Sequence, residues 1–272
     1  MGVLDDQALN DLERRDPDAA LTLIAEMSGA TDERLRRRAR ALAGRIMLRA
    51  ASPRGDPRSG VGRIRPMPWQ PGVDIDVEDS MDALLPAAIA GHPPDLARLR
   101  GPGWSRPATA VALIVDRSGS MGGERLATAA VLAAAVALRA EGDYSVIAFG
   151  SGVRTLKPQR QPMPAERVVA DLLALRGHGR TDLAAALRAA VTQLNESAAP
   201  RRITLLLSDG RATIGDDPVV AARTVEELLV IAPVGGGETG EQARTLARAV
   251  GARYASVTGP SSVPAAVAAV WP

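Results

Sequence analysis

The chain of 272 residues is long enough for one large domain, or for a domain of ordinary size with an additional region. Hydrophobic residues make up 46% of it and aromatic residues only 2%, so Ala, Val and Leu must supply most of the core. Cysteine is absent, which excludes disulfide bonds, thiolate catalysis and cysteine-ligated zinc.

The charge pattern argues against nucleic-acid and membrane partners. The formal net charge is only +2, arginines alternate with acidic residues, and aromatic residues for base stacking are few. No run of about 18 unbroken apolar residues occurs, and residues 1–6 are acidic instead of basic and apolar. We therefore expect a cytoplasmic protein that binds neither nucleic acid nor membrane.

The first 50 residues predict a helical N-terminal region. Residues 4–28 read as helix divided at Asp16-Pro17, and residues 32–50 as a second helix. The second helix has an apolar stripe formed by Leu35, Ala39, Leu42 and Ile46. Its other face carries Arg34, Arg36, Arg37, Arg38 and Arg40. We interpret the arginines as a solvated face, with an acidic groove on a partner as the alternative.

Residues 51–107 predict a Pro/Gly-rich linker with a short strand and a short helix. The alternation of residues 73–77 predicts the strand, and Ser80 predicts the cap of a helix from Met81 to about Ala90. The acidic run at residues 74–79 is interpreted as a cap on this helix. The alternative is that its oxygens lie near a metal site in another copy.

Residues 108–272 alternate between strand and helix patterns. We expect strands at about residues 109–115, 144–149, 152–157, 202–207, 228–234 and 253–257. We expect helices at about residues 123–140, 164–175, 182–196, 217–225, 239–250 and 261–270. The alternation predicts an α/β fold of the Rossmann-like, doubly wound kind, with a mainly parallel six-stranded sheet. Gly150-Ser151 leaves room only for a tight hairpin, so one edge strand should be antiparallel.

Three loops of this region carry oxygen-bearing side chains. Asp116, Ser118 and Ser120 follow the first strand, Thr181 precedes a helix, and Asp209 follows the strand at 202–207. In a doubly wound sheet such positions share the edge at the carboxyl ends of the strands, where these folds bind ligands. Two carboxylates with hydroxyls make an oxygen pocket suited to a hard divalent cation. The alternative is that the serines only cap the following helix.

These five residues, in this order and with these flanks, resemble the metal-ion-dependent adhesion site of von Willebrand factor type A domains. The resemblance covers about residues 108–272. It implies a bound Mg²⁺, or Mn²⁺, that accepts an acidic side chain from a protein partner, and it implies no catalysis. In that pattern Ser118 and Ser120 ligate the metal directly, Thr181 directly or through water, and Asp116 and Asp209 mostly through water.

The order of regions resembles the CoxE-like and magnesium-chelatase D-like proteins that act with MoxR-type AAA+ ATPases. That resemblance implies an adaptor or cofactor of such an ATPase, in protein remodelling or metalloenzyme maturation. The sequence has no Gly-x-x-x-x-Gly-Lys phosphate loop of its own, and Lys157 is its sole lysine.

Two other functions stay open from the sequence. One is a metal-dependent hydrolase or phosphotransfer enzyme that uses His178 or Asp182 beside the ion. The other is a component of a stress or conflict system, in which similar domains assemble signalling complexes.

Overall fold

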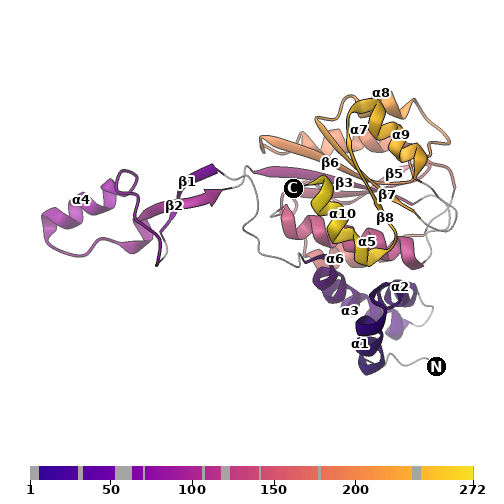
Figure 1. The fold of residues 1–272 in the computed structure, drawn as a ribbon, viewed down its shortest axis with the longest axis horizontal. Helices are drawn as coiled ribbons and strands as arrows, with labels where there is room; N and C mark the ends of the chain where they lie inside the picture. Colours follow the sequence, from indigo (N-terminus) through magenta and orange to yellow (C-terminus); the bar gives the residue numbers. More distant parts are fainter. Residues whose placement is uncertain are drawn as a thin grey trace. The chain divides into compact units, whose positions relative to one another are not determined.

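The structure is a computed structural model that describes residues 6–29, 33–52, 63–69, 71–105, 108–117, 123–140, 142–176, 179–234 and 240–271. Two compact units make up the chain (Figure 1). The α/β unit comprises Met1–Gly55 and Thr109–Pro272, and the insert unit comprises Asp56–Ala108. The regions expected at residues 1–50 and 108–272 thus form a single compact unit.

The sheet of the α/β unit has the strand order β5-β4-β3-β6-β7-β8. Its strands are β3 (Thr109–Asp116), β4 (Tyr144–Phe149), β5 (Val153–Lys157), β6 (Arg201–Leu207), β7 (Glu227–Pro233) and β8 (Arg253–Val257). All neighbours pair in parallel except β4 and β5, which are antiparallel at one edge. The predicted doubly wound α/β fold and its antiparallel edge strand are confirmed.

Helices cover both faces of this sheet (Figure 1). One face carries α7 (Leu183–Leu194), α8 (Pro218–Ala222) and α9 (Glu241–Val250). The other carries α5 (Gly123–Arg139), α6 (Ala165–Leu173) and α10 (Val263–Val270), which follows the short η2 (Pro260–Ser262). β3 and β4 are buried along their centres because parallel strands are covered on both sides.

The N-terminal helices add a further layer over α5 and α6. They are α1 (Asp6–Arg15), α2 (Pro17–Met27) and α3 (Glu33–Ala51). The break between α1 and α2 lies at Asp16, whose Oδ1 accepts a hydrogen bond from the backbone N of Ala19 at 3.0 Å. The buried side chains of this layer share the core of α5, α6 and α10, and they include Leu21, Ile24, Ile46 and Met47.

The arginines of α3 are only partly described. Arg36 pairs with Glu33, and the Nε of Arg40 donates to the carbonyl of Ser28 at 3.1 Å. The side chains of Arg34, Arg37 and Arg38, and that of Leu35, lie outside the described residues. Arg40 therefore holds the end of α2 against α3 instead of pointing only into solvent.

In the insert unit, β1 (Arg63–Pro68) and β2 (Arg100–Ser105) form an antiparallel pair. Between them lie α4 (Met81–Ala90) and the short η1 (Leu96–Arg98). The strand expected at residues 73–77 is not formed, and the prediction was wrong: the segment is irregular between two turns, and neighbouring groups bind its backbone. The Nε1 of Trp69 donates to the carbonyl of Val73, and the backbone N of Asp76 donates to the carbonyl of Arg100.

Ser80 occupies the N-cap position of α4, as expected, but its hydroxyl makes no cap hydrogen bond. Its Oγ accepts from the backbone N of Arg100 at 2.9 Å and donates to the carbonyl of Arg100 at 3.2 Å. The serine thus joins α4 to β2. None of the helices in the described ranges is long and apolar enough to cross a membrane.

Candidate functional site

The site begins with two neighbouring strands of the α/β unit. Asp116 is the last residue of β3, and Ser208 and Asp209 directly follow β6. Since β3 and β6 are parallel, with Val115 opposite Leu207, these residues emerge at the same edge of the sheet. The structure therefore brings Asp116 and Asp209 together, as expected of adjacent parallel strand ends.

Ser208 orients the first of the two carboxylates. Its Oγ donates a hydrogen bond to the Oδ2 of Asp116 at 2.7 Å and accepts one from the backbone N of Gly210 at 3.0 Å. The serine is buried and the contact is partly buried, and it ties the ends of the two strands together. Asp116 is thereby held in one orientation at the edge of the sheet.

The loop after β6 orients the second carboxylate. The Oδ1 of Asp209 accepts from the backbone N of Arg211 at 2.8 Å, and its Oδ2 lies 3.6 Å from the Nε of Arg211. Gly210 has φ +82°, and a Cβ there would lie 2.3 Å from the backbone N of Ala243. Only glycine fits between this loop and the start of α9, so the residue after Asp209 cannot carry a side chain.

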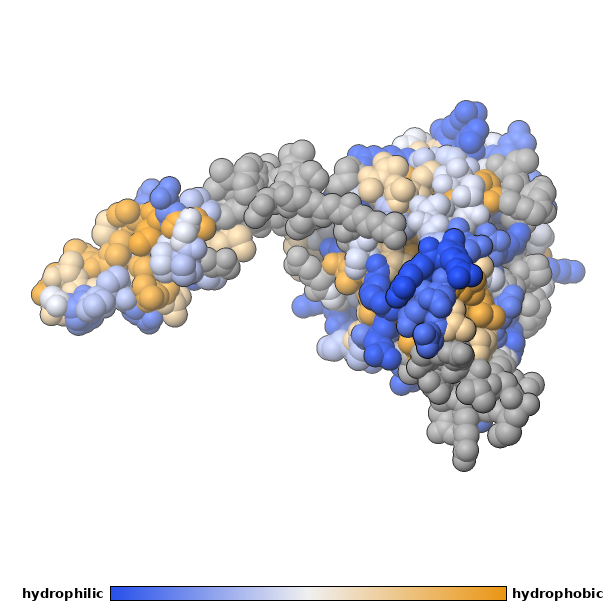
Figure 2. Space-filling view, turned by 60° about the horizontal axis from the view of Figure 1, so that its bottom comes forward, coloured by the Kyte–Doolittle hydropathy of each residue, from blue (hydrophilic) through white to orange (hydrophobic). Residues whose placement is uncertain are grey.

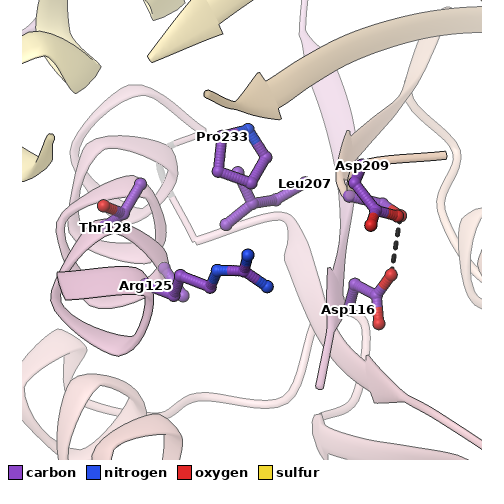
Figure 3. A pocket seen from close by; sticks show the side chains of 8 residues that line it. Asp116, Arg125, Thr128, Leu207, Asp209 and Pro233 are labelled. Carbon is purple, nitrogen blue, oxygen red and sulfur yellow. Dashed lines mark hydrogen bonds between the residues drawn. The ribbon is translucent and has the colours of Figure 1, made fainter. Parts of the chain in front are cut away.

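Both carboxylates line a small cavity of about 30 Å³ (Figure 3). The other lining residues are Arg125, Thr128, Ala129, Leu207, Ser208 and Pro233. Such a volume holds a water molecule or a small ion, and no organic ligand. The cavity thus suits a bare or hydrated cation.

Arg125 enters this cavity from the helix opposite the strands. Figure 3 shows its guanidinium extending from α5 toward the side on which Asp116 and Asp209 lie. A fixed positive charge here offsets part of the negative charge of the two carboxylates. The positive charge of Arg125 therefore influences how strongly the cavity attracts a metal cation.

Thr181 lies on the loop before α7 and is buried. Its backbone N donates to the Oγ1 of Thr213 at 2.8 Å, and its carbonyl accepts from the backbone N of Thr213 at 2.9 Å. The next residue, Asp182, donates its backbone N to the carbonyl of Gly150, which directly follows β4. Because β4 neighbours β3, these contacts bring the Thr181 loop to the edge that carries Asp116.

The remaining candidates, Ser118, Ser120 and His178, lie outside the described residues. Sequence reasoning gave no role to Ser208, although it adjoins Asp209, and missed Arg125. The signal for Ser208 was its place at a strand end beside a candidate ligand. Nothing in the sequence pattern singled out Arg125, because its direction depends on how α5 packs.

The donor set fits a hard divalent cation held partly by neutral oxygens. Within the described ranges, no three His, Asp or Glu side chains gather in a way that would hold a metal ion by themselves. Asp116 and Asp209 supply two negative charges, so further ligands must be hydroxyls or water. Such a set balances the charge of Mg²⁺ or Mn²⁺ and keeps affinity for one more anionic oxygen.

The fold is that of an open, doubly wound α/β domain, and its candidate metal ligands lie at the carboxyl ends of the strands. The sequence profile of the von Willebrand factor type A domain matches residues 111–211. This stretch runs from β3 past Asp209, so it includes Asp116, Thr181 and Asp209. Residues 111–211 therefore match the von Willebrand factor type A domain family, and comparison with curated proteins finds no match.

Solved structures similar to the chain come from several organisms. The manganese-loaded TRAP protein of Plasmodium vivax is 20% identical, with a TM-score of 0.49 over 59% of this chain and 72% of that one. A von Willebrand factor type A protein from Catenulispora acidiphila is 17% identical, with a TM-score of 0.48 over 60% of this chain and 42% of that one. An aerotolerance-related membrane protein from Bacteroides fragilis is 17% identical, with a TM-score of 0.48 over 60% and 98%.

Proposed function

We propose that the α/β unit is a metal-dependent protein-interaction module in which Asp116, Ser118, Ser120, Thr181 and Asp209 hold one Mg²⁺ or Mn²⁺. The observation that supports this most is the pair of carboxylates, Asp116 and Asp209, that line one ion-sized cavity at the carboxyl ends of β3 and β6. When bound, the ion supplies an open coordination position for an acidic side chain of the partner.

The protein's own residues prepare this site before any ion binds. Ser208 holds the carboxylate of Asp116, the backbone of Arg211 holds that of Asp209, and Thr213 holds the Thr181 loop. Fixed ligands lose less conformational entropy when they take up an ion. These contacts therefore prepare the described part of the site to bind an ion.

For the partner, we propose a MoxR-type AAA+ ATPase that this chain serves as adaptor or cofactor in protein remodelling or metalloenzyme maturation. The chain lacks a phosphate-binding loop, so work on a client requires a separate ATPase. The helical layer of α1–α3 ahead of the type A domain agrees with the layout of CoxE-like proteins. A stress or conflict-system assembly component would use the same metal chemistry with another partner.

An enzymatic role for Asp182 is less favoured by the geometry. Its Oδ1 accepts from the backbone N of Ala185 at 2.9 Å, so the carboxylate caps α7. A hydrolase or phosphotransfer enzyme would need a general base or a second metal beside the first. Hydrolysis of a phosphate ester that depends on Mg²⁺ and on Asp182 would favour this alternative.

The first test measures Mg²⁺ and Mn²⁺ binding by isothermal titration calorimetry on the full chain. Asp116→Asn and Asp209→Asn keep the shape of each side chain and a hydrogen-bond acceptor, so the fold should persist. We expect each variant to weaken binding at least tenfold, since each removes one of two charges that offset the ion. The matched control is Asp171→Asn, which removes a half-buried carboxylate that pairs with Arg167 on α6.

The second test concerns the partner. Wild type and the Ser118→Ala/Ser120→Ala variant are used to capture proteins from native extract with and without Mg²⁺. Capture of an AAA+ ATPase by wild type in Mg²⁺ alone supports the proposal. Capture that is the same without Mg²⁺ and in the Ser118→Ala/Ser120→Ala variant would place the interface elsewhere. Unchanged Mg²⁺ affinity in Asp116→Asn would refute the metal site itself.

A further inference from the structure

The insert unit exposes an unusual share of large apolar side chains. In the described ranges twelve large hydrophobic residues are exposed, and eight of them belong to this unit: Met67, Val73, Ile75, Val77, Met81, Leu85, Ile89 and Leu96. Figure 2 shows hydrophobic surface gathered on the unit that contains α4, bordered by hydrophilic patches. Single exposed apolar residues are ordinary, but a group of this size marks a binding surface.

The helix α4 presents the centre of this surface. Met81, Leu85 and Ile89 are spaced four residues apart and form one stripe, with Leu85 and Ile89 55% and 80% exposed. The opposite side of the helix buries the small side chains of Ala83 and Ala87. The helix thus turns three of its four large apolar groups outward, with Leu84 half-buried, which is the reverse of the usual arrangement on a surface helix.

The interior of the unit is correspondingly small. Its buried hydrophobic residues, as far as the structure describes them, are Ala83, Ala87 and Leu99. A unit of about 50 residues is marginal in stability even with a full core. Coverage of the stripe by a partner would therefore stabilise the unit as well as bind the partner.

The charges around the stripe indicate the kind of partner. Residues 69–97 contain six acidic residues and no Lys or Arg. Asp74, Glu78, Asp79, Asp82 and Asp95 among them are exposed, and Asp79 and Asp82 adjoin the start of the stripe in sequence; the exposed arginines Arg98 and Arg100 follow only beyond Leu96. Carboxylates repel an anionic membrane surface, and a second copy docked face to face would set acidic residues against each other. A basic partner avoids both costs.

We propose that the insert unit binds an amphipathic helix of another protein, whose apolar stripe covers Met81, Leu85 and Ile89 and whose flanking Lys or Arg residues pair with the acidic border. Helices dock on apolar stripes through residues spaced three and four apart, which is the spacing that α4 offers. The inference goes beyond the metal-dependent function and is independent of it, because none of the five proposed metal ligands belongs to this unit.

The test uses the full chain and a fluorescent 18-residue peptide of Leu and Lys, patterned to form a basic amphipathic helix. Fluorescence anisotropy should show saturable binding that persists in EDTA and in Asp116→Asn. A scrambled peptide of the same composition, and a peptide of the same pattern with Glu in place of Lys, should bind at least tenfold more weakly. Persistence in EDTA separates this surface from the metal site, so either proposal can fail alone.

Variants of the protein locate the surface. Leu85→Ser/Ile89→Ser should weaken peptide binding at least tenfold, whereas Val220→Ser, at a position 64% exposed on α8, should leave it unchanged. Asp79→Asn/Asp82→Asn should weaken binding about threefold to tenfold at low salt and less at high salt. The control Glu196→Gln/Asp216→Asn removes the same charge from the α/β unit and should have no effect.

A second measurement tests the same surface if the Leu85→Ser/Ile89→Ser variant misfolds. The chain has no cysteine, so Ile89→Cys introduces a single thiol that takes an environment-sensitive fluorophore. The peptide should shift its emission to the blue. Four results would each overturn the proposal. The scrambled peptide could bind equally well, or the thiol could resist labelling in the free chain. The chain could form a dimer that Leu85→Ser/Ile89→Ser abolishes, or it could sediment with phospholipid vesicles.

Discussion

Arg125 and Ser208 show how single residues adjust a site whose ligands come from elsewhere. Ser208 fixes one oxygen of Asp116, and Arg125 brings a positive charge into the cavity that the two carboxylates line. The two residues act in opposite directions on a bound cation. The serine preorganises a ligand, while the arginine offsets the charge that attracts the ion.

We expect Arg125→Gln to tighten Mg²⁺ binding by roughly fivefold, which corresponds to about 1 kcal/mol for the removal of a partly screened charge. Calorimetric titration of the full chain measures the change. Arg223→Gln, which removes an exposed arginine of the same unit, is the control for net charge. Weaker binding in Arg125→Gln would mean that the arginine supports the site instead of competing with the ion.

Lys157 is a buried amine on β5, at the end of the strands opposite to Asp116 and Asp209. It is 1% exposed, its Nζ donates to the carbonyls of Tyr144 and Pro158, and it lies 4.0 Å from the centre of the Tyr144 ring. Burial lowers the pKa of this amine from 10.5 to about 8, although the nearby charge of Asp143 acts to raise it. Burial also raises the pKa of the Tyr144 hydroxyl, with a further contribution from Glu166.

These shifts predict a stability that increases with pH between about 8 and 10. In that range the unfolded chain keeps a proton on Lys157 that the folded chain has released, so the free energy of unfolding rises with pH. Above about pH 10 the raised pKa of Tyr144 acts in the opposite direction. Urea unfolding from pH 7.5 to 10 should show the rise in wild type and lose it in Lys157→Met; an equal rise in both would assign it to other groups.

At the scale of elements, α2 connects η2 and α5 of the α/β unit. The carboxylate of Asp18 accepts from the backbone N and the Oγ of Ser261, at 2.7 and 2.9 Å, just before α10. At its other end, α2 lies against Gly123, the first residue of α5. The N-terminal layer therefore contacts the start of the helix that follows the Ser118–Ser120 loop.

Gly123→Ala should loosen this contact. Gly123 has φ +25°, and a Cβ would lie 2.6 Å from the Oε1 of Glu26 and 2.8 Å from the Cγ2 of Thr22. We expect a loss of about 1–2 kcal/mol in the free energy of unfolding, measured in urea. Gly142→Ala shares the positive φ but meets no atom within 4 Å, so it isolates the backbone cost.

Glu26→Ala completes a double-mutant cycle with Gly123→Ala. If the clash with α2 causes the loss, the glutamate substitution should recover part of it. Strictly additive effects would show that α2 and α5 are not coupled through this contact.

At the scale of the whole molecule, removal of the insert unit and removal of the N-terminal helices should have different effects on the stability of the chain. Replacement of residues 56–108 by a Gly/Ser linker of about 15 residues should leave the thermal unfolding midpoint within about 3 °C and Mg²⁺ affinity unchanged. Deletion of residues 1–52 should abolish cooperative unfolding, because Leu21, Ile24 and Met47 belong to the core shared with α5. Calorimetry on both variants checks this, and a stable product of the second deletion would contradict it.

Much of the α/β unit follows from local pattern. The apolar runs that became β3, β4 and β6, and the helices between them, lie within about two residues of their predicted ends because strand and helix periods are local properties. The same pattern placed Asp116 and Asp209 at strand ends. Their convergence follows from the parallel order of β3 and β6, which alternation of strand and helix already implies.

The insert unit was harder to predict. β1 contains Pro66 and Pro68, and β2 contains Gly101 and Gly103, so neither has the composition of a strand. They pair with each other across α4, and Ser80 and Asp76 bind Arg100 instead of forming the local structure that their neighbours suggest. Such pairing depends on partners about 20 to 40 residues away in sequence, which no window of residues reveals.

The sequence by itself therefore determined the succession of elements in the type A domain and which oxygen-bearing residues stand at its strand ends, because both depend on near neighbours along the chain. Only the tertiary structure decided that α1–α3 share the core of α5, that Ser208 and Arg125 line the cavity with the carboxylates, and that α4 turns Met81, Leu85 and Ile89 outward. Each of these depends on which surfaces meet, and the meeting of surfaces is settled by the burial of apolar area over the whole fold.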